Sequence, residues 1–280
     1  MNDDQQIDRL RDKLKSARQQ TGVDMTILLR KYFIDGFLTL LSDSKYQNRF
    51  IWKGGMVLSA ITGVHERTTV DVDTLIRGLD LNPSNLTKII NEIISGRKYE
   101  GVSYQLKDVH EIQDSKDYAG QRIRINATLG KIQDTFHLDV ATGERLIPEE
   151  IEYAYRPLLS KNMIPILIYR PERILAEKLQ TLLVRTVFNT RMKDYYDIFI
   201  LSKDELIDFR IFKIAWNEVI SERHSSSEWD HWQEIMTDIH DNVTIKKYWQ
   251  QYTNTNQFAK DISFDEVISI CTEWFTLLGD

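Results

Sequence analysis

The spacing of apolar residues predicts two helices at the start of the chain. Residues 3 to 20 are highly charged and carry one narrow apolar stripe, made of Ile7, Leu10, Leu14 and Ala17. This spacing is typical of a helix that buries a single edge. Residues 24 to 41 have apolar side chains on a much broader face, so we expect this second helix to pack beneath a sheet.

The pattern then alternates between strands and helices. Phe50-Ile51-Trp52 is a short apolar run typical of a strand, which Gly54-Gly55 turns into a short helix. Residues 70 to 76 show the β-branched alternation of a second strand. Asn82-Pro83 then begins a helix that ends at Ser95, because asparagine is a favoured N-cap and proline fits the first helical position.

The rest of the pattern separates a sheet from a helical half. Further strands are expected at residues 102 to 106, 121 to 129, 135 to 140 and 164 to 169, with turns at 118 to 120 and 129 to 131. Helical periodicity follows at residues 171 to 187, 192 to 202, 204 to 221, 228 to 252 with a break, and 261 to 278. The pattern predicts an α+β fold, in which a mixed-sheet domain with N-terminal helices occupies residues 1 to 165 and an α-helical C-terminal domain occupies residues 166 to 280.

Composition and charge limit the classes of function. With 280 residues and 42% hydrophobic side chains, the chain can bury a substantial core. Its net charge of −6 argues against broad, non-specific binding to nucleic acid and favours at most a local basic patch. The single cysteine, Cys271, excludes an internal disulfide, and the first residues lack the features of a signal peptide. Because no apolar run approaches the roughly 20 residues of a spanning helix, we expect a cytoplasmic protein without a membrane segment.

A lysine and two glycines form the first candidate site. Lys53-Gly54-Gly55 falls between a predicted strand and a predicted helix, where backbone N–H groups and the helix N-terminus can hold a phosphate. Lys53 adds a positive charge. The alternative is that the glycines only make a tight turn, since glycine-rich motifs taken alone are prone to false matches.

Two aspartates on the next strand form the second candidate site. Asp71 and Asp73 are two residues apart, so both project to one side of the strand, as ligands of a divalent metal must. Their neighbours are apolar, and unpaired carboxylates in a buried strand are energetically expensive. A bound cation would remove that cost. The alternative is a pair of acids balanced by Arg67 and Arg77.

A third acid strengthens the metal interpretation. Asp139 is the lone acid of residues 136 to 140, a second apolar strand that can lie beside the first. Three acids on neighbouring strands make an oxygen-rich site suited to Mg²⁺ and substrate phosphates. Together with a phosphate-binding turn, such a site suggests nucleotidyl transfer, in which the protein mainly positions reactants and neutralises charge. His137 projects to the same side as Asp139, but a lone histidine on a strand is more often structural.

The helical half contains a further charged group. Lys178 could reach a triphosphate, and Asp194 and Asp197 share one helix face because they are three residues apart. The alternative is a solvated charged face in which Arg173 pairs with Glu177. The sequence has neither a cysteine pair, nor convincing zinc spacing, nor a G-x-S-x-G elbow, so zinc and serine-hydrolase chemistry lack support.

In their order along the chain, these motifs resemble the AbiEii/AbiGii nucleotidyltransferase toxin family. The resemblance spans most of residues 50 to 200. It is carried by Lys53-Gly54-Gly55, Arg67-Thr68-Thr69-x-Asp71-x-Asp73, His137-x-Asp139-Val140, Glu177-Lys178-Leu179 and Arg191-x-Lys193-Asp194-x-x-Asp197. That family belongs to the DNA polymerase β-like nucleotidyltransferase superfamily and includes the MenT toxins. The resemblance therefore implies that the sheet domain is a polymerase β-like nucleotidyltransferase domain.

The resemblance also implies an activity and a biological setting. The chain would be a Mg²⁺-dependent nucleotidyltransferase that uses a nucleoside triphosphate (NTP) and releases pyrophosphate. It would act as a toxin in a toxin–antitoxin or abortive-infection (phage defence) system, countered by an antitoxin encoded nearby.

By the same resemblance, individual residues receive roles. The expected catalytic residues are Asp71, Asp73, Asp139, Lys178 and Asp194, of which the first three bind metal. The expected nucleotide-binding residues are Lys53, Gly54, Gly55, Thr69, Lys178, Arg191 and Lys193. One position departs from the superfamily, because Met56 follows the glycines where Ser or Thr is common. Phosphate contact would then rely on backbone N–H groups, Ser59 or Thr69.

The nucleotide and the acceptor stay open at this stage. The MenT branch implies the 3′ end of tRNA as acceptor, AbiEii implies GTP, and a pyrimidine NTP is also compatible. One alternative keeps the fold but changes the acceptor to a protein side chain or a small molecule such as an aminoglycoside. Another is a catalytically silent NTP-binding module that docks a partner protein. The residues indicate neither the antitoxin surface nor the oligomeric state.

Overall fold

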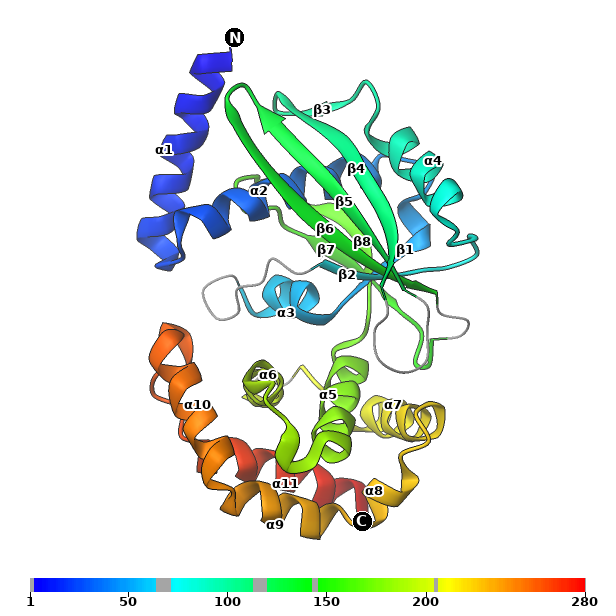
Figure 1. Cartoon of the computed structure of the whole chain (residues 1–280), viewed down its shortest axis with the longest axis vertical. Coiled ribbons are helices and arrows are strands. Elements are labelled where there is room, and N and C mark those ends of the chain that lie inside the picture. The colour runs from blue at the N-terminus through cyan, green and yellow to red at the C-terminus, as the bar shows by residue number, and fades with distance from the viewer. Residues whose placement is uncertain (1–2, 64–71, 113–119, 143–145, 204–205, 280) are drawn as a thin grey trace. The chain divides into compact units, whose positions relative to one another are not determined.

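The computed structural model describes residues 3–63, 72–112, 120–142, 146–203 and 206–279 (Figure 1). Contacts between residues divide the chain into two compact units. Unit 1 consists of Met1–Leu146 and Glu150–Tyr169, and unit 2 of Ile147–Glu149 and Arg170–Asp280. Unit 1 contains the sheet, and unit 2 is helical.

Unit 1 is built on one mixed sheet. Its strands are β1 (Phe50–Lys53), β2 (Val72–Ile76), β3 (Lys98–Tyr99), β4 (Val102–Ile112), β5 (Gly120–Leu129), β6 (Ile132–Thr142), β7 (Ile151–Tyr155) and β8 (Ile164–Ile168). They are ordered β3-β4-β5-β6-β2-β1-β8-β7. The pairs β2–β6 and β1–β8 are parallel, and the other neighbours are antiparallel. The mixed sheet predicted from the sequence is confirmed.

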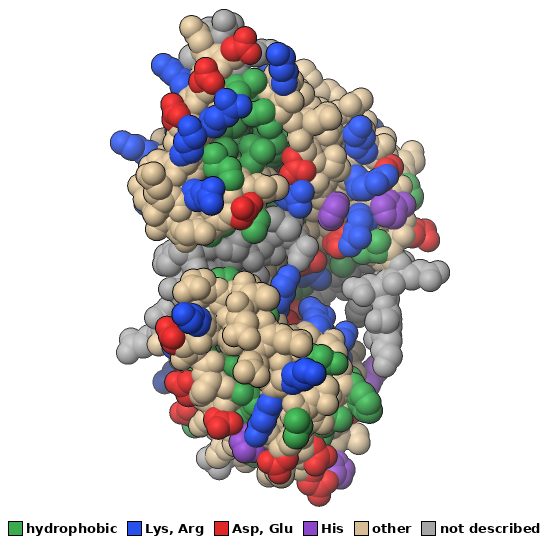
Figure 2. Space-filling view, turned by 60° about the vertical axis from the view of Figure 1, so that its left-hand side comes forward, with side chains coloured by type: hydrophobic (Ala, Val, Ile, Leu, Met, Phe, Trp, Pro, Cys, Tyr) green, Lys and Arg blue, Asp and Glu red, His purple; other side chains and the backbone are tan. Residues whose placement is uncertain are grey.

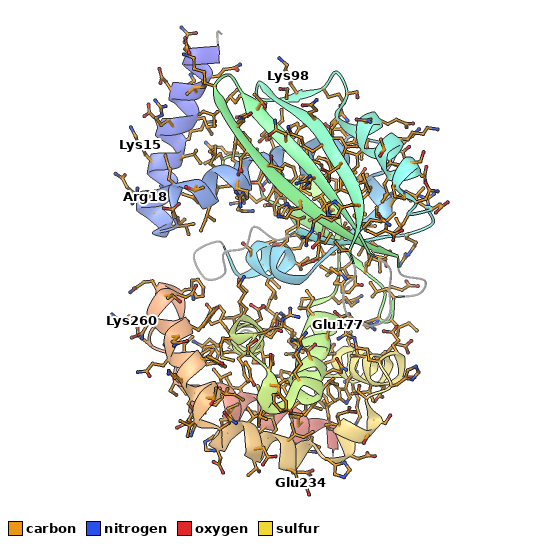
Figure 3. All side chains as sticks on the ribbon, in the orientation of Figure 1. Lys15, Arg18, Lys98, Glu177, Glu234 and Lys260 are labelled. Atoms are coloured by element: carbon orange, nitrogen blue, oxygen red, sulfur yellow. The ribbon has the colours of Figure 1, made fainter. Side chains whose placement is uncertain are left out.

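Two N-terminal helices belong to this unit. In α1 (Asp3–Thr21) the predicted stripe of Ile7, Leu10, Leu14 and Ala17 is buried, while Lys15 and Arg18 project outward (Figure 3). α2 (Met25–Ser42) passes behind the sheet in Figure 1 and contacts β3, β6 and β8. The expectation that the broad apolar face of this helix packs beneath the sheet is therefore confirmed.

Strand alternation leaves the other face of β4, β5 and β6 polar. On β5, Ile123 and Ile125 are fully buried on the α2 side, where α4 (Pro83–Ile94) also contacts β4. Arg122 and Arg124 lie on the opposite face, because successive side chains of a strand point to opposite sides. The remaining helix of unit 1, α3 (Gly54–Thr62), follows β1 directly. The candidate residues of this unit lie on the polar face and at the β1–α3 junction.

Unit 2 is a bundle of helices around an aromatic core. Its helices are α5 (Pro171–Arg185), α6 (Met192–Lys203), α7 (Phe209–Glu222), α8 (Ser226–Asp230), α9 (Trp232–Asp241), α10 (Val243–Thr255) and α11 (Phe264–Gly279). The rings of Trp216, Trp229 and Phe275 contact one another, and Tyr195 and Phe212 are fully buried. The aromatic residues at helical spacing in this half are therefore mainly core residues.

Several predicted boundaries differ from the structure. The segment predicted at 228 to 252 is three helices, with breaks at His231 and at Asn242, whose side chain caps α10. β4 continues past residue 106 to Ile112. The prediction ended too early because a register shift between Leu106 and Asp108 interrupts the apolar alternation that marks a strand in the sequence.

Two strands were missed by the sequence pattern. β3 and β7 occupy the two edges of the sheet, where few side chains are buried. The turn predicted at 118 to 120 lies largely outside the described residues. Among the described helices, none is both long and apolar enough to span a membrane.

Candidate active site

Four charged residues stand side by side on the sheet. Arg122 of β5 is paired in register with Asp139 of β6, which is paired with Asp73 of β2, which is paired with Lys53 of β1. Residues directly opposite one another on neighbouring strands project from the same face, with Cβ atoms about 5 Å apart. The row therefore reads basic, acidic, acidic, basic.

Asp139 is bound by an arginine. The Arg122 guanidinium donates from Nε to Oδ1 at 2.7 Å and from Nη2 to Oδ2 at 2.6 Å. Both side chains are partly solvent-accessible, with exposed fractions of 38% for Arg122 and 29% for Asp139. This bidentate arrangement is among the strong interactions between an arginine and a carboxylate, and it also fixes their orientation. Asp139 thus has a balancing charge of its own.

Asp73 lies against the glycine turn. β1 ends at Lys53 and α3 begins at Gly54, so the predicted strand-to-helix turn is confirmed. Gly54 has φ +63°, and a Cβ atom placed on it would lie 2.8 Å from Asp73 Oδ2. The missing side chain therefore lets the carboxylate approach the helix N-terminus. Met56, the departure from the superfamily motif, is buried.

Part of the predicted metal site cannot be placed in this geometry. Asp71, Thr69 and Arg67 lie outside the described residues. Within the described part of the chain, no group of three His, Cys, Asp or Glu residues is arranged to hold a metal ion. Arg77, one of the two arginines considered as partners of the acids, instead binds Glu150, with Nη2 2.6 Å from Oε2.

The donors that are described do fit a divalent cation. Carboxylates directly opposite each other on adjacent strands repel unless a positive charge is near. Asp73 and Asp139 form such a pair, and they offer only oxygen ligands, which Mg²⁺ prefers. A cation beside them would relieve the repulsion that Arg122 balances on one side.

The charged residues of the helical half form a cluster within unit 2. Lys178 Nζ lies 2.7 Å from Asp194 Oδ1 and 2.7 Å from Asp197 Oδ2, and Arg191 Nε lies 2.9 Å from Asp194 Oδ2. The side chains of Asp194 and Asp197 are 5% and 0% exposed. Burial alone would lower the pKa of Lys178, but the charges of Asp197 and Asp194 outweigh it and raise that pKa. Lys178 is therefore held as a cation between two helices.

The neighbouring arginine is not part of a solvated face. Arg173 is buried, donates to Glu177 Oε1 at 3.0 Å and also binds Glu222. The alternative of an exposed Arg173–Glu177 pair is therefore wrong for Arg173. In contrast, Arg191 and Lys193 lie at the surface of α6 and of the turn before it.

Arg122 was not found from the sequence, although a signal for it exists. The predicted turn at residues 129 to 131 is observed as a two-residue loop that pairs Leu129 with Ile132. Counting seven residues back along β5 and seven forward along β6 places Arg122 opposite Asp139. A basic residue at this position follows from the turn once the register is fixed.

The chain matches the family model described as nucleotidyl transferase AbiEii toxin, type IV toxin–antitoxin system, over residues 36–269. The chain belongs to the AbiEii nucleotidyltransferase toxin family. It is accordingly a nucleotidyltransferase that takes an NTP as substrate, and it has an antitoxin as partner. The family predicted from the ordered motifs is confirmed.

Two solved structures are similar to this AbiEii-family chain. JHP933 from Helicobacter pylori is similar with a TM-score of 0.50 and 16% identity, over 92% of this chain and 95% of that chain. An antigenic nucleotidyltransferase-like protein from Paracoccidioides brasiliensis gives a TM-score of 0.39 and 16% identity, over 69% and 92%. No curated protein sequence matches the chain. At 16% identity, the likeness to JHP933 supports the fold alone, and with the family match it confirms the α+β class.

Proposed function

We propose that this AbiEii-family enzyme uses Mg²⁺ held by Asp71, Asp73 and Asp139 to transfer a nucleotide from an NTP to the 3′ end of tRNA. The observation that carries the proposal is the register that sets Asp73 directly beside Asp139 on the polar face of the sheet. When bound, Mg²⁺ would neutralise the triphosphate and favour attack by the acceptor hydroxyl. Pyrophosphate would leave.

The glycine turn is proposed to bind the triphosphate. Gly54 and Gly55 open α3, whose first backbone N–H groups have no partners within the helix and can donate to phosphate oxygens. Lys53 stands at the end of the charged row and supplies a nearby positive charge. Because Ser59 is buried, Thr69 is the remaining hydroxyl proposed to assist.

The acceptor and the nucleotide are proposed from the family resemblance. A tRNA 3′ end fits an acidic protein, because only its terminal nucleotides need to approach the site and no broad basic surface is required. On the face of the molecule that Figure 2 shows, Lys and Arg side chains are interspersed with Asp and Glu. GTP is the first nucleotide to test, and a pyrimidine NTP is the second.

The roles of the unit 2 residues remain predictions. Lys178 and Asp194 are predicted to take part in catalysis, and Arg191 and Lys193 to bind the nucleotide. Arg191 can be tested separately, because its side chain is 56% exposed and its removal opens no core cavity. Arg191→Gln should raise KM for the NTP several-fold. Its free energy of unfolding, measured with urea, should change by less than about 0.5 kcal/mol, as is usual for a surface substitution. An unchanged KM would remove Arg191 from the nucleotide site.

Labelled nucleotides test the proposal as a whole. The protein is incubated with each α-labelled NTP, Mg²⁺ and total RNA, and compared with Asp71→Ala. We expect one NTP to label tRNA with wild type only. Label in protein or small-molecule fractions would favour the alternative acceptors. No transfer above the variant with any NTP, together with tight nucleotide binding, would favour the catalytically silent module.

The biological setting is proposed to be a phage-defence toxin–antitoxin pair that acts in the cytoplasm, where tRNA and NTPs are found. Expression of wild type alone should arrest growth, and coexpression of the product of the adjacent gene should restore it. Growth arrest by Asp71→Ala equal to that of wild type would separate toxicity from nucleotidyl transfer.

A further inference from the structure

The carboxylate of Asp139 is already engaged by Arg122. Nε of the guanidinium donates to Oδ1 at 2.7 Å and Nη2 donates to Oδ2 at 2.6 Å, so the pairing is bidentate and engages both oxygens. The pairing joins two neighbouring strands, and the register of the β5–β6 hairpin fixes it. Any other cation that binds Asp139 must therefore share these oxygens with the arginine or displace it.

A second arginine of β5 forms a similar pair with an aspartate of β4, outside the charged row. Arg124, two residues along β5, binds Asp108 of β4 through Nε at 2.9 Å to both oxygens. Arg124 holds the pKa of the Asp108 carboxyl at about 2. This pair lies on the same face, but Arg124 is opposite His137 rather than an acid of the charged row. It is a matched control for Arg122.

The difference between the two pairs is the acid next to Asp139. Asp139 has Asp73 directly beside it in register, and two carboxylates at this spacing repel. The positive charge of Arg122 lowers that repulsion, but it also lowers the negative potential that attracts a divalent cation. One guanidinium therefore performs the charge-balancing role that the proposed metal would perform.

We propose that Arg122 is a positioning residue that acts as the built-in counter-ion of Asp139, and that Arg122 and a divalent cation compete for the Asp139 oxygens. The inference rests on the proposed function, because it takes Asp139 as a metal ligand. In the enzyme without nucleotide, Arg122 holds Asp139 in place and keeps metal affinity low. Once released from Asp139, the guanidinium is a donor for the anionic phosphates that arrive with the metal. Metal and nucleotide then bind with positive coupling.

Direct binding of Mn²⁺, measured by electron paramagnetic resonance on nucleotide-free protein, tests the competition. Arg122→Gln should bind Mn²⁺ about tenfold more tightly than wild type, because the substitution removes a competing positive charge from both Asp139 oxygens. Arg124→Gln should match wild type. Arg122→Lys, which keeps the charge but cannot form the bidentate pairing, should fall between wild type and Arg122→Gln. Circular dichroism of each variant checks that the sheet is intact.

The outcomes separate this inference from the proposed function. If Arg122→Gln binds Mn²⁺ as wild type does, or more weakly, competition is excluded; weaker binding would mean that Arg122 orients Asp139 for the metal. If Asp139→Asn keeps the wild-type affinity for Mn²⁺, the metal role of Asp139 fails instead. An equal gain in affinity for Arg124→Gln and Arg122→Gln would reduce the effect to net charge and overturn the specific role of Arg122.

Discussion

Gly54 has two independent reasons to be a glycine. Its φ of +63° lies in the left-handed region, and a side chain would meet Asp73 Oδ2 at 2.8 Å. Gly22 has a similar φ of +72° but nothing within 4 Å of an added Cβ. The two positions share the left-handed backbone conformation, and of the two only Gly54 has a carboxylate where a Cβ atom would lie.

This comparison predicts that stability and activity respond differently. Gly22→Ala and Gly54→Ala should each lose at least about 1 kcal/mol of unfolding free energy, because a Cβ is strained in the left-handed region. Only Gly54→Ala should slow nucleotide transfer, since its methyl group displaces the Asp73 carboxylate. Urea unfolding and single-turnover rates measure the two effects. If Gly54→Ala transfers nucleotide as fast as Gly22→Ala, the position of the Asp73 carboxylate does not affect the rate of transfer.

The candidate acids were named from the sequence residue by residue, whereas Arg122, the partner of Asp139, was not. Asp73, two residues after Asp71, and Asp139 are acids among apolar residues in predicted strands, a pattern that is visible in the sequence. The partner of Asp139 depends on which residues the hairpin places opposite each other, and that register is set by the turn at Gly130. Arg122 can therefore be named only once the register of the hairpin is known.

At the scale of helices, α5 and α6 are joined by a buried ion cluster. Lys178 of α5 lies between Asp194 and Asp197 of α6, at 2.7 Å from each. Both helices were predicted within two residues at each end, because their apolar periodicity is local. Their contact through Lys178 was not predicted, since it joins side chains 16 and 19 residues apart whose meeting depends on helix packing.

Removing this lysine should destabilise unit 2. Lys178→Met removes the cation that lies between the buried carboxylates of Asp194 and Asp197, and breaking a buried ion pair costs about 3–5 kcal/mol. Arg185→Met, an exposed position at the end of the same helix, should change the unfolding free energy by less than about 0.5 kcal/mol. Equal effects of the two substitutions, measured by urea unfolding, would show that the cluster does not stabilise the protein.

The effect of Lys178 should also depend on pH in a defined direction. Its pKa in the folded protein is raised above the ordinary value of 10.5. The stabilisation is thus fully present below pH 10.5 and is lost as the pH rises through the folded-state pKa. The difference in unfolding free energy between wild type and Lys178→Met should be constant from pH 7 to 9 and shrink above 10.5. A difference that grows with pH would contradict the ion cluster.

At the scale of the whole molecule, the change from alternating strands to helical periodicity predicted the fold class correctly. The assignment of Ile147–Glu149 to unit 2 could not be predicted from the sequence. Ile147–Glu149 belong to unit 2 because Arg173 Nη1 donates to the Ile147 carbonyl at 2.8 Å and Arg170 Nε donates to the Glu149 carbonyl at 3.0 Å. Such contacts between side chains and distant backbone leave no pattern in the sequence.

The single thiol reports on the integrity of unit 2. Cys271 of α11 is fully buried, and burial raises the pKa of its thiol. Because the thiolate is the reactive form, the native protein should react with iodoacetamide far more slowly than the protein in denaturing urea. Mass spectrometry after timed exposure measures this. Rapid labelling under native conditions would mean that α11 opens readily or packs differently.

Asp73 and Asp139 are proposed to act together at one catalytic site on the polar face of the sheet. Single-turnover transfer of labelled nucleotide at saturating Mg²⁺, measured for Asp73→Asn, Asp139→Asn and Asp108→Asn, tests this proposal most directly. The first two variants should lose about 10²–10³-fold in rate, as expected when a preorganised electrostatic group is removed. Asp108→Asn, an aspartate on the same face outside the charged row, should stay within about twofold of wild type. A rate for Asp139→Asn equal to that of Asp108→Asn would show that Asp139 does not take part in catalysis.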